Sequence, residues 1–551
     1  MKYFKIFRIP QTPEQKKENR TNLLFGLLSG VLLGLSFPPF PLPFISFFAF
    51  IPFFFVLEKK DSLASINRFS YFMLFFFNLI TLYWVGGWTK ETDSFLMISG
   101  VALLFFNPLF YLIVTSLYYF SKKVFGKKTA LFLFPFYWVL FEYLYSLTDL
   151  RFPWLTLGNC LPYFNRFIQI ADVVGVYGLS LIIIFINVFL FLSVKNWKET
   201  KKINFNYLIT AAAIFFIVLI YGTIRVNSFE QGDNKIKVGL IQPNFNPWNK
   251  WQAGKVNEQL DLYLSMSEQA INKGAKFIIW PESALPVYLL SGNYEIEVAR
   301  INQFVSSKNI YLMTGMPDVN FYFNKSESPK DAKETKSGVL YASYNSILLF
   351  SPNSPVIQKY KKIKLVPFGE HVPFVEQFPF LGQFIKWEVG ISSWNVGKEK
   401  IVFDFNEPEN TPIKVAGVVC IESIYPDFVA DFVKAGANFI VVVTNDSWYG
   451  YSSGPFQHKE ISVLRAVENR KSVVRAANGG VSCIIDPLGR TISETKFFTR
   501  DILVGDAVIQ NGLTFYSRYP LIFPLIASFI SIITILFFIY TKILTKLKKR
   551  I

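Results

Sequence analysis

Three short segments of the chain each place a reactive side chain at the end of an apolar, strand-like run. In residues 277–286, Pro281 stops the predicted strand and Glu282 follows on the turn. In residues 415–426, Cys420 ends another predicted strand and precedes a predicted helix, whose first N–H groups can stabilise a thiolate. A carboxylate that accepts a proton and a cysteine that attacks a carbonyl carbon can together perform acyl transfer through a thioester.

The third segment, residues 360–373, carries three lysines followed by Phe-Gly-Glu. An ammonium group can stabilise the oxyanion that forms when a nucleophile adds to a carbonyl carbon. The period-two geometry of a strand puts Lys362 and Lys364 on one side and Lys361 on the other. The residues alone therefore leave the choice among the three lysines open.

Each of these residues also has an ordinary structural interpretation. Glu282 could begin a helix, where the dipole favours an acid. The lysines could form a solvated face, and Cys420 could be a core residue, because free cysteines are often buried. The chain has only two His and three Cys, without C-x-x-C or H-E-x-x-H spacing, which argues against a metal site. We expect neither a metal ion nor a cofactor.

The strands that would hold these residues belong to a polar region of nearly 300 residues. Apolar runs rich in β-branched residues alternate there with helix-like segments. The predicted strands are 236–241, 277–280, 310–314, 346–350, 415–419, 439–443 and 481–485, with helices including 256–272 and 457–469. This rhythm predicts a layered α/β sandwich whose reactive residues lie at the ends of the strands.

The rest of the chain is typical of a membrane protein, since 52% of all residues are hydrophobic and only 17% are charged. Eight apolar stretches are candidates to cross a bilayer. They are 23–37, 40–57, 69–88, 95–120, 129–147, 174–194, 207–224 and 520–540. The first two are short and interrupted by proline, so a re-entrant hairpin is the alternative for them.

Basic residues are distributed unevenly around these stretches. Five segments, 1–20, 58–68, 121–128, 195–203 and 541–551, hold 22 Lys and Arg against five acids. Their net charge of +17 equals that of the whole chain, so the basic excess indicates membrane topology and argues against a nucleic-acid partner. We expect both termini in the cytoplasm and the polar region outside the cytoplasmic membrane. The predicted division is 1–224 membrane helices, 225–518 catalytic domain and 519–551 last helix and tail.

Taken in order, the three reactive segments resemble the Glu–Lys–Cys triad of the nitrilase superfamily. With membrane spans around the domain, the chain is most similar to its membrane-embedded branch, the apolipoprotein N-acyltransferase family. Matching motifs include Trp-Pro-Glu-Ser-Ala at 280–284 and Cys-Ile-Glu at 420–422. The others lie at 152–158, 175–178, 365–370, 444–448, 454–458 and 475–479. The resemblance implies a nitrilase-like αββα sandwich inserted between the seventh and eighth of eight transmembrane helices.

The resemblance also assigns site residues. The family's lysine stands eight residues before the Glu of Phe-Gly-Glu, which selects Lys362, and its base and nucleophile match Glu282 and Cys420. Further functional positions match Glu370, Glu422 and Trp251. Ile421 stands where the family usually has an aromatic residue and Lys364 where it usually has His, which affects the expected fit of the acyl chain more than the activity.

The activity that the resemblance implies is transfer of a fatty acyl chain from a phospholipid, such as phosphatidylethanolamine, to an apolipoprotein. The acceptor is the α-amine of the S-diacylglyceryl cysteine at the start of that protein, in the bacterial cytoplasmic membrane. The reaction follows ping-pong chemistry through a thioester and completes lipoprotein maturation. Two alternatives are a membrane-tethered amidase, and a receptor or transporter with an inactive nitrilase-like domain, against which the intact triad argues.

The segment that follows Glu370 is crowded with large apolar residues. Residues 371–390 include Phe378, Phe380 and Leu381, and two prolines discourage a regular helix. We expect this segment to form a lid that dips into the membrane and binds lipid, with Trp251 and Trp448 as the opposite rim; packing into the domain core is the alternative. Glu142, inside the fifth stretch, either packs within the bundle or lines a lipid path.

Overall fold

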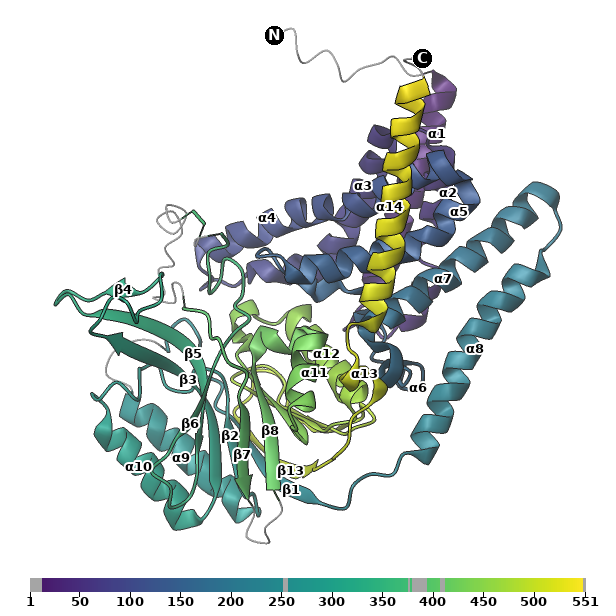
Figure 1. Ribbon diagram of the computed structural model, residues 1–551. Helices are drawn as coiled ribbons and strands as arrows, with labels where there is room; N and C mark the ends of the chain where they lie inside the picture. The colour runs from purple at the N-terminus through teal and green to yellow at the C-terminus, as the bar shows by residue number, and fades with distance from the viewer. Residues whose placement is uncertain (1–11, 251–255, 375–376, 379–393, 407–411, 549–551) are drawn as a thin grey trace.

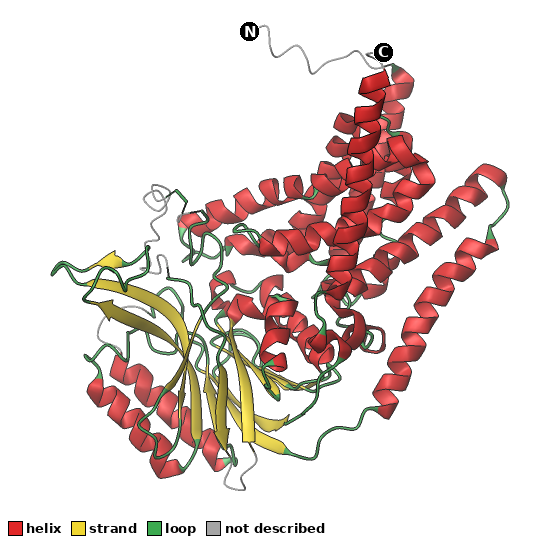
Figure 2. Cartoon of the chain, in the orientation of Figure 1, coloured by secondary structure: helices red, strands yellow, loops and turns green. Residues whose placement is uncertain are grey.

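The computed structural model describes residues 12–250, 256–374, 377–378, 394–406 and 412–548. Long helices form one part of the molecule, and an α/β domain containing all the described strands forms the other (Figures 1 and 2). The start of α1 (Pro13–Ser36) and the end of α14 (Ile522–Lys548) lie together at the end of the helical part that is remote from the α/β domain (Figure 1).

The helical part is built from elements with clear local signals. Thr12 caps α1 in a reciprocal capping box with Gln15, and Ser62 caps α3. The other elements are α2 Ile51–Lys59, α3 Leu63–Leu82, η3 Tyr83–Gly86, α4 Ser94–Phe110, α5 Leu112–Leu147, η4 Pro153–Leu155, η5 Leu157–Cys160, α6 Asn165–Ile168, α7 Ala171–Thr200 and α8 Phe205–Ser228.

Five segments within the described ranges are long and apolar enough to cross a membrane, so the predicted count of eight spans is not confirmed. They are Leu63–Gly86, Ser94–Leu147, Ala171–Thr200, Phe205–Ser228 and Ile522–Thr545. The 54-residue segment covers the fourth and fifth predicted spans and is broken at Gly126, whose φ of 81° suits glycine. The second predicted span is a 3-10 turn, η2 Pro43–Phe47, followed by only nine residues of α2, because prolines interrupt it.

The α/β domain contains two sheets. In the first, the order is β13-β1-β2-β3-β5-β4, with β6 also paired to β5, and β1, β2 and β3 run parallel. In the second, the order is β12-β11-β10-β9-β8-β7, with β8, β9 and β10 parallel. The bounds are β1 Lys235–Gln242, β2 Phe277–Trp280, β3 Tyr311–Tyr322, β4 Lys333–Glu334, β5 Leu340–Phe350, β6 Gln358–Lys361, β7 Val402–Asn406, β8 Pro412–Val419, β9 Phe439–Thr444, β10 Val473–Ala477, β11 Cys483–Ile485, β12 Thr491–Glu494 and β13 Asp501–Val508.

The alternation of side chains along β2 shows how the layers stack. Phe277 and Ile279 join the core between the two sheets, where Phe277 meets Phe439 of β9. Ile278 and Trp280 instead face α9 (Val256–Asn272) and α10 (Glu295–Lys308). On the far side, α11 (Pro426–Lys434) and α12 (Ser453–Asn469) pack on the second sheet. The predicted αββα sandwich is therefore present, and its central strands read as continuous apolar runs because both faces are buried.

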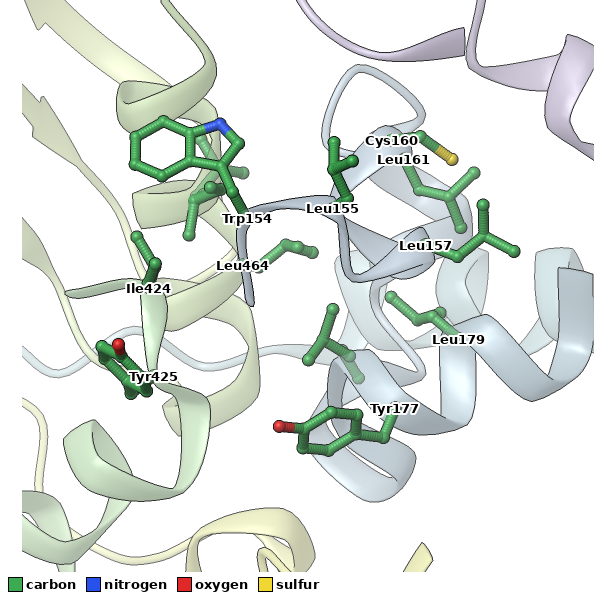
Figure 3. Packing of buried hydrophobic residues seen from close by; sticks show 14 of the residues in the cluster. Trp154, Leu155, Leu157, Cys160, Leu161, Tyr177, Leu179, Ile424, Tyr425 and Leu464 are labelled. Atoms are coloured by element: carbon green, nitrogen blue, oxygen red, sulfur yellow. The ribbon is translucent and has the colours of Figure 1, made fainter. Parts of the chain in front are cut away.

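The domain is fixed to the helical part through α12. Gln457 Oε1 accepts hydrogen bonds from Trp84 Nε1 of η3 at 3.1 Å and Trp154 Nε1 of η4 at 2.7 Å. Figure 3 shows apolar side chains of one buried cluster beside this contact, among them Trp154, Leu155, Ile424 and Leu464. The strand ends that carry the reactive residues are thus held next to the membrane helices.

Glu142 of α5 has a structural role in this region. Its Oε1 accepts hydrogen bonds from Trp138 Nε1 at 2.9 Å and from the Leu157 backbone N–H at 2.7 Å. These contacts tie α5 to the first residue of η5. They support the interpretation in which Glu142 packs within the bundle.

Candidate active site

The ends of β2, β6 and β8 bring the predicted acid, lysine and cysteine together. Lys362 follows directly on β6 and is fully buried, and its Nζ lies 3.3 Å from Glu282 Oε1. The same Nζ lies 2.8 Å from Glu370 Oε1. The chain between Lys362 and Glu370, eight residues later, forms a loop that brings the Glu370 carboxylate back to the lysine.

The turn that carries Glu282 is tightly packed against β3. Ala284 donates its N–H to the carbonyl oxygen of Gly315 at 2.8 Å. A Cβ at Gly315 would lie 2.6 Å from Glu282 Cα, so only glycine allows this approach. Glu282 is therefore positioned by backbone contacts with β3 rather than by a helix that begins at this residue.

Asn345 of β5 connects the two carboxylates and has no signal in the sequence. Its Nδ2 donates to Glu282 Oε1 at 2.8 Å and to Glu370 Oε1 at 3.1 Å. Burial lowers the pKa of Lys362, but the carboxylates of Glu370 and Glu282 outweigh it and hold that pKa well above its usual value. The lysine is an ammonium ion between two acids.

The three lysines make different contacts in the structure. The Lys361 ammonium lies over the ring of Tyr344, 4.0 Å from its centroid. The Lys364 ammonium lies 5.2 Å from the ring centroid of Tyr425. Of the three lysines, only Lys362 contacts the carboxylates of Glu282 and Glu370.

Cys420 occupies the sharp turn between β8 and η7 (Cys420–Ile424). Its φ is 49°, the left-handed conformation that non-glycine residues seldom adopt. Burial and, next, the charge of Glu282 raise the pKa of the Cys420 thiol well above its usual value, while Lys362 opposes them. The resting side chain is therefore a thiol, and it needs a base before it can attack.

Glu422 holds the lysine and cysteine segments together. Its Oε1 accepts from Tyr360 OH at 2.6 Å and from the Ile363 N–H at 2.7 Å, and its Oε2 accepts from the Val419 N–H at 2.8 Å. Burial raises the pKa of Glu422. The hydrogen bonds of Glu422 to β6, β8 and the turn after β6 therefore tie the segment of Lys362 to that of Cys420.

A second buried network lies beneath the cysteine. His458 of α12 contacts the Cys420 carbonyl oxygen and, on its other ring nitrogen, Asp446. Burial raises the pKa of Asp446, but Arg475 and His458 outweigh it and hold that pKa well below its usual range. The motifs at 444–448, 454–458 and 475–479 contribute Asp446, His458 and Arg475 to this network, three residues to which sequence reasoning assigned no role.

Only part of the predicted lipid-binding set can be placed. Trp448 is half-buried and lies edge-on to Trp248, with ring centroids 5.0 Å apart. Phe378 is 53% exposed. Trp251, Phe380 and Leu381 lie outside the described residues, so the lid remains a prediction.

An apolar cleft of about 290 Å³ opens between α4 and the two halves of α5. Phe374, four residues after Glu370, contributes to its wall. Other lining residues are Phe110, Leu117, Phe141, Tyr145 and Leu150. In the described part of the chain, no group of three His, Cys, Asp or Glu side chains could hold a metal ion.

The class of protein follows from the sandwich and the residues at its strand ends. Residues 237–511 match the family of carbon-nitrogen hydrolases, which defines the α/β domain as nitrilase-like. Residues 29–189 match the apolipoprotein N-acyltransferase N-terminal domain. The chain belongs to the apolipoprotein N-acyltransferase family, as its motifs predicted.

Full-length relatives support this assignment. The chain is 34% identical over 504 residues to the apolipoprotein N-acyltransferase of Chlorobaculum tepidum, covering 90% of this chain and 93% of that protein. It is 32% identical to that of Rickettsia bellii, covering 94% of this chain and 95% of the relative. Among solved structures, an amidase from Nesterenkonia sp. is 16% identical with a TM-score of 0.36, covering 53% of this chain and 94% of that one.

Proposed function

We propose that this chain transfers a fatty acyl chain from a membrane phospholipid to the α-amine of an S-diacylglyceryl cysteine at the start of an apolipoprotein. The observation that carries the proposal is the contact of Lys362 with both Glu282 and Glu370, beside Cys420 in a domain attached to apolar helices. The names of the relatives support the acceptor, and phosphatidylethanolamine is the donor we propose.

In the first half-reaction, Glu282 takes the thiol proton of Cys420 while the sulfur attacks the ester carbon of the phospholipid. The oxyanion is stabilised by the Lys362 ammonium and the backbone N–H of Ile421, contacts of a kind worth about 3 kcal/mol each. Collapse breaks the ester C–O bond, and Glu282 returns the proton to the leaving alkoxide. The products are a lysophospholipid and a thioester on Cys420.

In the second half-reaction, the amine of the acceptor attacks the thioester carbonyl. Glu282 accepts a proton from the amine and passes it to the departing sulfur, so the resting thiol returns. The raised pKa of Cys420 favours this last step, because a thiolate with a high proton affinity is readily reprotonated. The order is ping-pong, since the first product leaves before the acceptor reacts.

The proposed topology places the catalytic domain outside the bacterial cytoplasmic membrane and both termini inside. Three ion pairs support it, because they join four of the basic segments at one end of the helices. They are Lys60 with Glu18 at 2.8 Å, Lys122 with Asp61 at 3.0 Å, and Lys195 with Glu58. Lys60 lies beside Glu18, near the start of α1, so the chain has crossed back by residue 60, which supports a second membrane passage through η2 and α2. With that passage the chain crosses the membrane eight times. Residues 225–518 then lie between the seventh and eighth crossings.

The test is an intact-mass measurement on the purified full chain mixed with phosphatidylethanolamine. We expect one added acyl chain that hydroxylamine removes, and no adduct with Cys420→Ala. Adding a diacylglyceryl peptide should move the acyl chain to the peptide amine with little free fatty acid. An acylated Cys420→Ala protein would overturn the assignment of the nucleophile, and release of the acyl chain to water alone would favour the membrane-tethered hydrolase.

A further inference from the structure

Three buried polar atoms beside the active site have no hydrogen-bond partner among the described residues. They are Lys250 Nζ, Gln259 Oε1 and Tyr263 OH. Their residues are 3%, 5% and 0% exposed. A buried polar atom without a hydrogen-bond partner destabilises the folded protein, and a buried charge without one does so more strongly. Several unpartnered polar atoms that lie together therefore indicate a binding site for a polar ligand.

Contacts between these residues show that they form one cluster. Gln259 Nε2 donates to the Lys250 carbonyl oxygen at 3.3 Å, and Gln259 and Tyr263 lie one turn apart on α9. The Lys250 ammonium lies 5.8 Å from the ring centroid of Phe245, which in turn packs on Tyr263. The three residues therefore form one cluster, in which Lys250 and Phe245 lie against the face of α9 that carries Gln259 and Tyr263.

The cluster adjoins the proposed base. Tyr263 stacks on Trp280 with ring centroids 4.6 Å apart, and Glu282 follows two residues after Trp280. Burial lowers the pKa of Lys250 to about 7, and the charge of Glu282 acts in the opposite direction. Lys250 is therefore within the electrostatic field of the site, yet it forms no ion pair with a described residue.

The chemistry of the three atoms selects the ligand. An ammonium and a hydroxyl can donate to anionic oxygens, while the Gln259 carbonyl can accept from an N–H or O–H group. An anion would complete the pairing of Lys250, whereas the amine of an acceptor would not. In a phospholipid the phosphate is separated from the acyl ester only by the glycerol carbons, so an anion site beside the base suits the donor.

We infer that Lys250, Gln259 and Tyr263 form the subsite that binds the phosphodiester and headgroup of the phospholipid donor. The ammonium and the phenol donate to phosphate oxygens, and Gln259 accepts from the headgroup. This inference rests on the proposed function, because it requires a phospholipid as the acyl donor. It assigns to Lys250 a role in binding, separate from the covalent steps at Cys420.

The experiment compares two acyl donors on the full-length protein. One is phosphatidylethanolamine, and the other is the p-nitrophenyl ester of the same fatty acid, which has no phosphate. Lys250→Met should lower the rate of Cys420 acylation by phosphatidylethanolamine about 10-fold or more, the size expected for a lost charged hydrogen bond. Acylation by the p-nitrophenyl ester should stay within twofold. Lys273→Met, an exposed lysine just after α9, is the matched control.

Further variants separate binding from folding. Lys250→Arg keeps the charge and should retain most of the phospholipid reaction. Lys250→Met should unfold at the same or a higher temperature, because it removes an unpartnered buried amine. Equal losses with both donors, or no loss with either, would overturn the subsite. A wild-type protein that reacts with the p-nitrophenyl ester but not with any phospholipid would instead overturn the proposed function.

Discussion

The Nε2 atom of His458 lies 3.1 Å from the backbone carbonyl oxygen of Cys420. Ser423 Oγ lies 2.9 Å from the same Nε2 and donates to the Cys420 carbonyl oxygen at 2.8 Å. The other ring nitrogen lies 2.9 Å from Asp446 Oδ1, and Arg475 lies 2.6 Å from Oδ2 of the same carboxylate. This chain of contacts orients the histidine, which holds the carbonyl of the nucleophile while its backbone remains in the left-handed conformation.

The first prediction is that His458 positions Cys420. His458→Ala should slow thioester formation about 2- to 10-fold, because an uncharged positioning hydrogen bond contributes about 0.5–1.5 kcal/mol. The KM for phospholipid should not change, since the contact is with the nucleophile. His458→Gln, whose amide can donate to the same carbonyl, should recover part of the rate. Rapid-quench mass spectrometry measures the adduct, and an unchanged rate in His458→Ala would refute the role.

The second prediction separates Cys420 from the other two cysteines. All three are free thiols, and Cys160 and Cys483 are fully buried. Burial raises the pKa of Cys483 to about 12. Cys420→Ser should form no adduct, whereas Cys160→Ala and Cys483→Ala should keep acylation at a cost of about 1–2 kcal/mol in unfolding free energy. Thiol labelling with mass mapping should find Cys420 unpaired, and loss of the adduct in Cys483→Ala would contradict this account.

The third prediction concerns the neighbouring lysines. Lys362→Ala should abolish thioester formation and lower the free energy of unfolding by about 3–5 kcal/mol, because it leaves buried carboxylates without their cation. Lys361→Ala removes only the contact with Tyr344 and should cost about 0.5–1 kcal/mol with near-normal activity. Adduct formation and chemical denaturation are measured on both variants. Normal adduct formation in Lys362→Ala would exclude it from the reaction.

The fourth prediction assigns Glu370 to orientation of the lysine. Glu370→Gln keeps an oxygen that can accept from Lys362 and Asn345 but removes the charge that raises the pKa of Lys362. We expect some thioester but turnover about 10- to 100-fold lower, again the size of a charged hydrogen bond. Glu399→Gln, an exposed acid of the same domain, is the control and should behave as wild type. An adduct-free Glu370→Gln protein would indicate a direct part in the chemistry.

Much of the sandwich could be predicted because its central strands are buried on both faces and read as apolar runs. The helix at 256–272 was predicted with the bounds that α9 has, since its apolar residues recur at helical spacing. β10 and β13 were missed, because buried Arg475 interrupts the first and two acids interrupt the second. A charged residue in a strand, whether buried like Arg475 or exposed like Asp506, hides that strand from hydrophobic patterns.

The site was predicted less completely, for reasons that lie in its long-range contacts. Strand periodicity grouped Lys362 with Lys364, but β6 ends at Lys361 and the chain turns, so the two lysines separate. Asn345 is a single amide in an apolar strand, and Lys250 a single lysine in a loop. The importance of Asn345 follows from its hydrogen bond to Glu282, 63 residues away in the chain. The importance of Lys250 follows from the absence of a hydrogen-bond partner for its ammonium among the described residues.

The last prediction concerns the apolar segment after Glu370. Phe374 and Phe378 are 39% and 53% exposed, and Phe374 also lines the cleft between α4 and α5. Side chains this exposed contribute little to the core of the domain. Phe374, four residues after Glu370 and in the wall of an apolar cleft, has the position that a lipid-contacting segment requires.

Replacing Phe374 and Phe378 together by Ser should therefore lower turnover of long-chain phospholipid sharply and leave acylation by a short-chain p-nitrophenyl ester close to wild type. The free energy of unfolding should fall by no more than about 1–2 kcal/mol, because exposed groups are removed. Ile296→Ser, which changes a residue 74% exposed on α10, is the control for loss of surface apolar area and should affect neither donor. Steady-state kinetics with both donors and thermal unfolding give the answer. A double variant that unfolds outright would mean that these residues pack into the core, and equal losses with both donors would mean that they shape the catalytic groups rather than guide lipid.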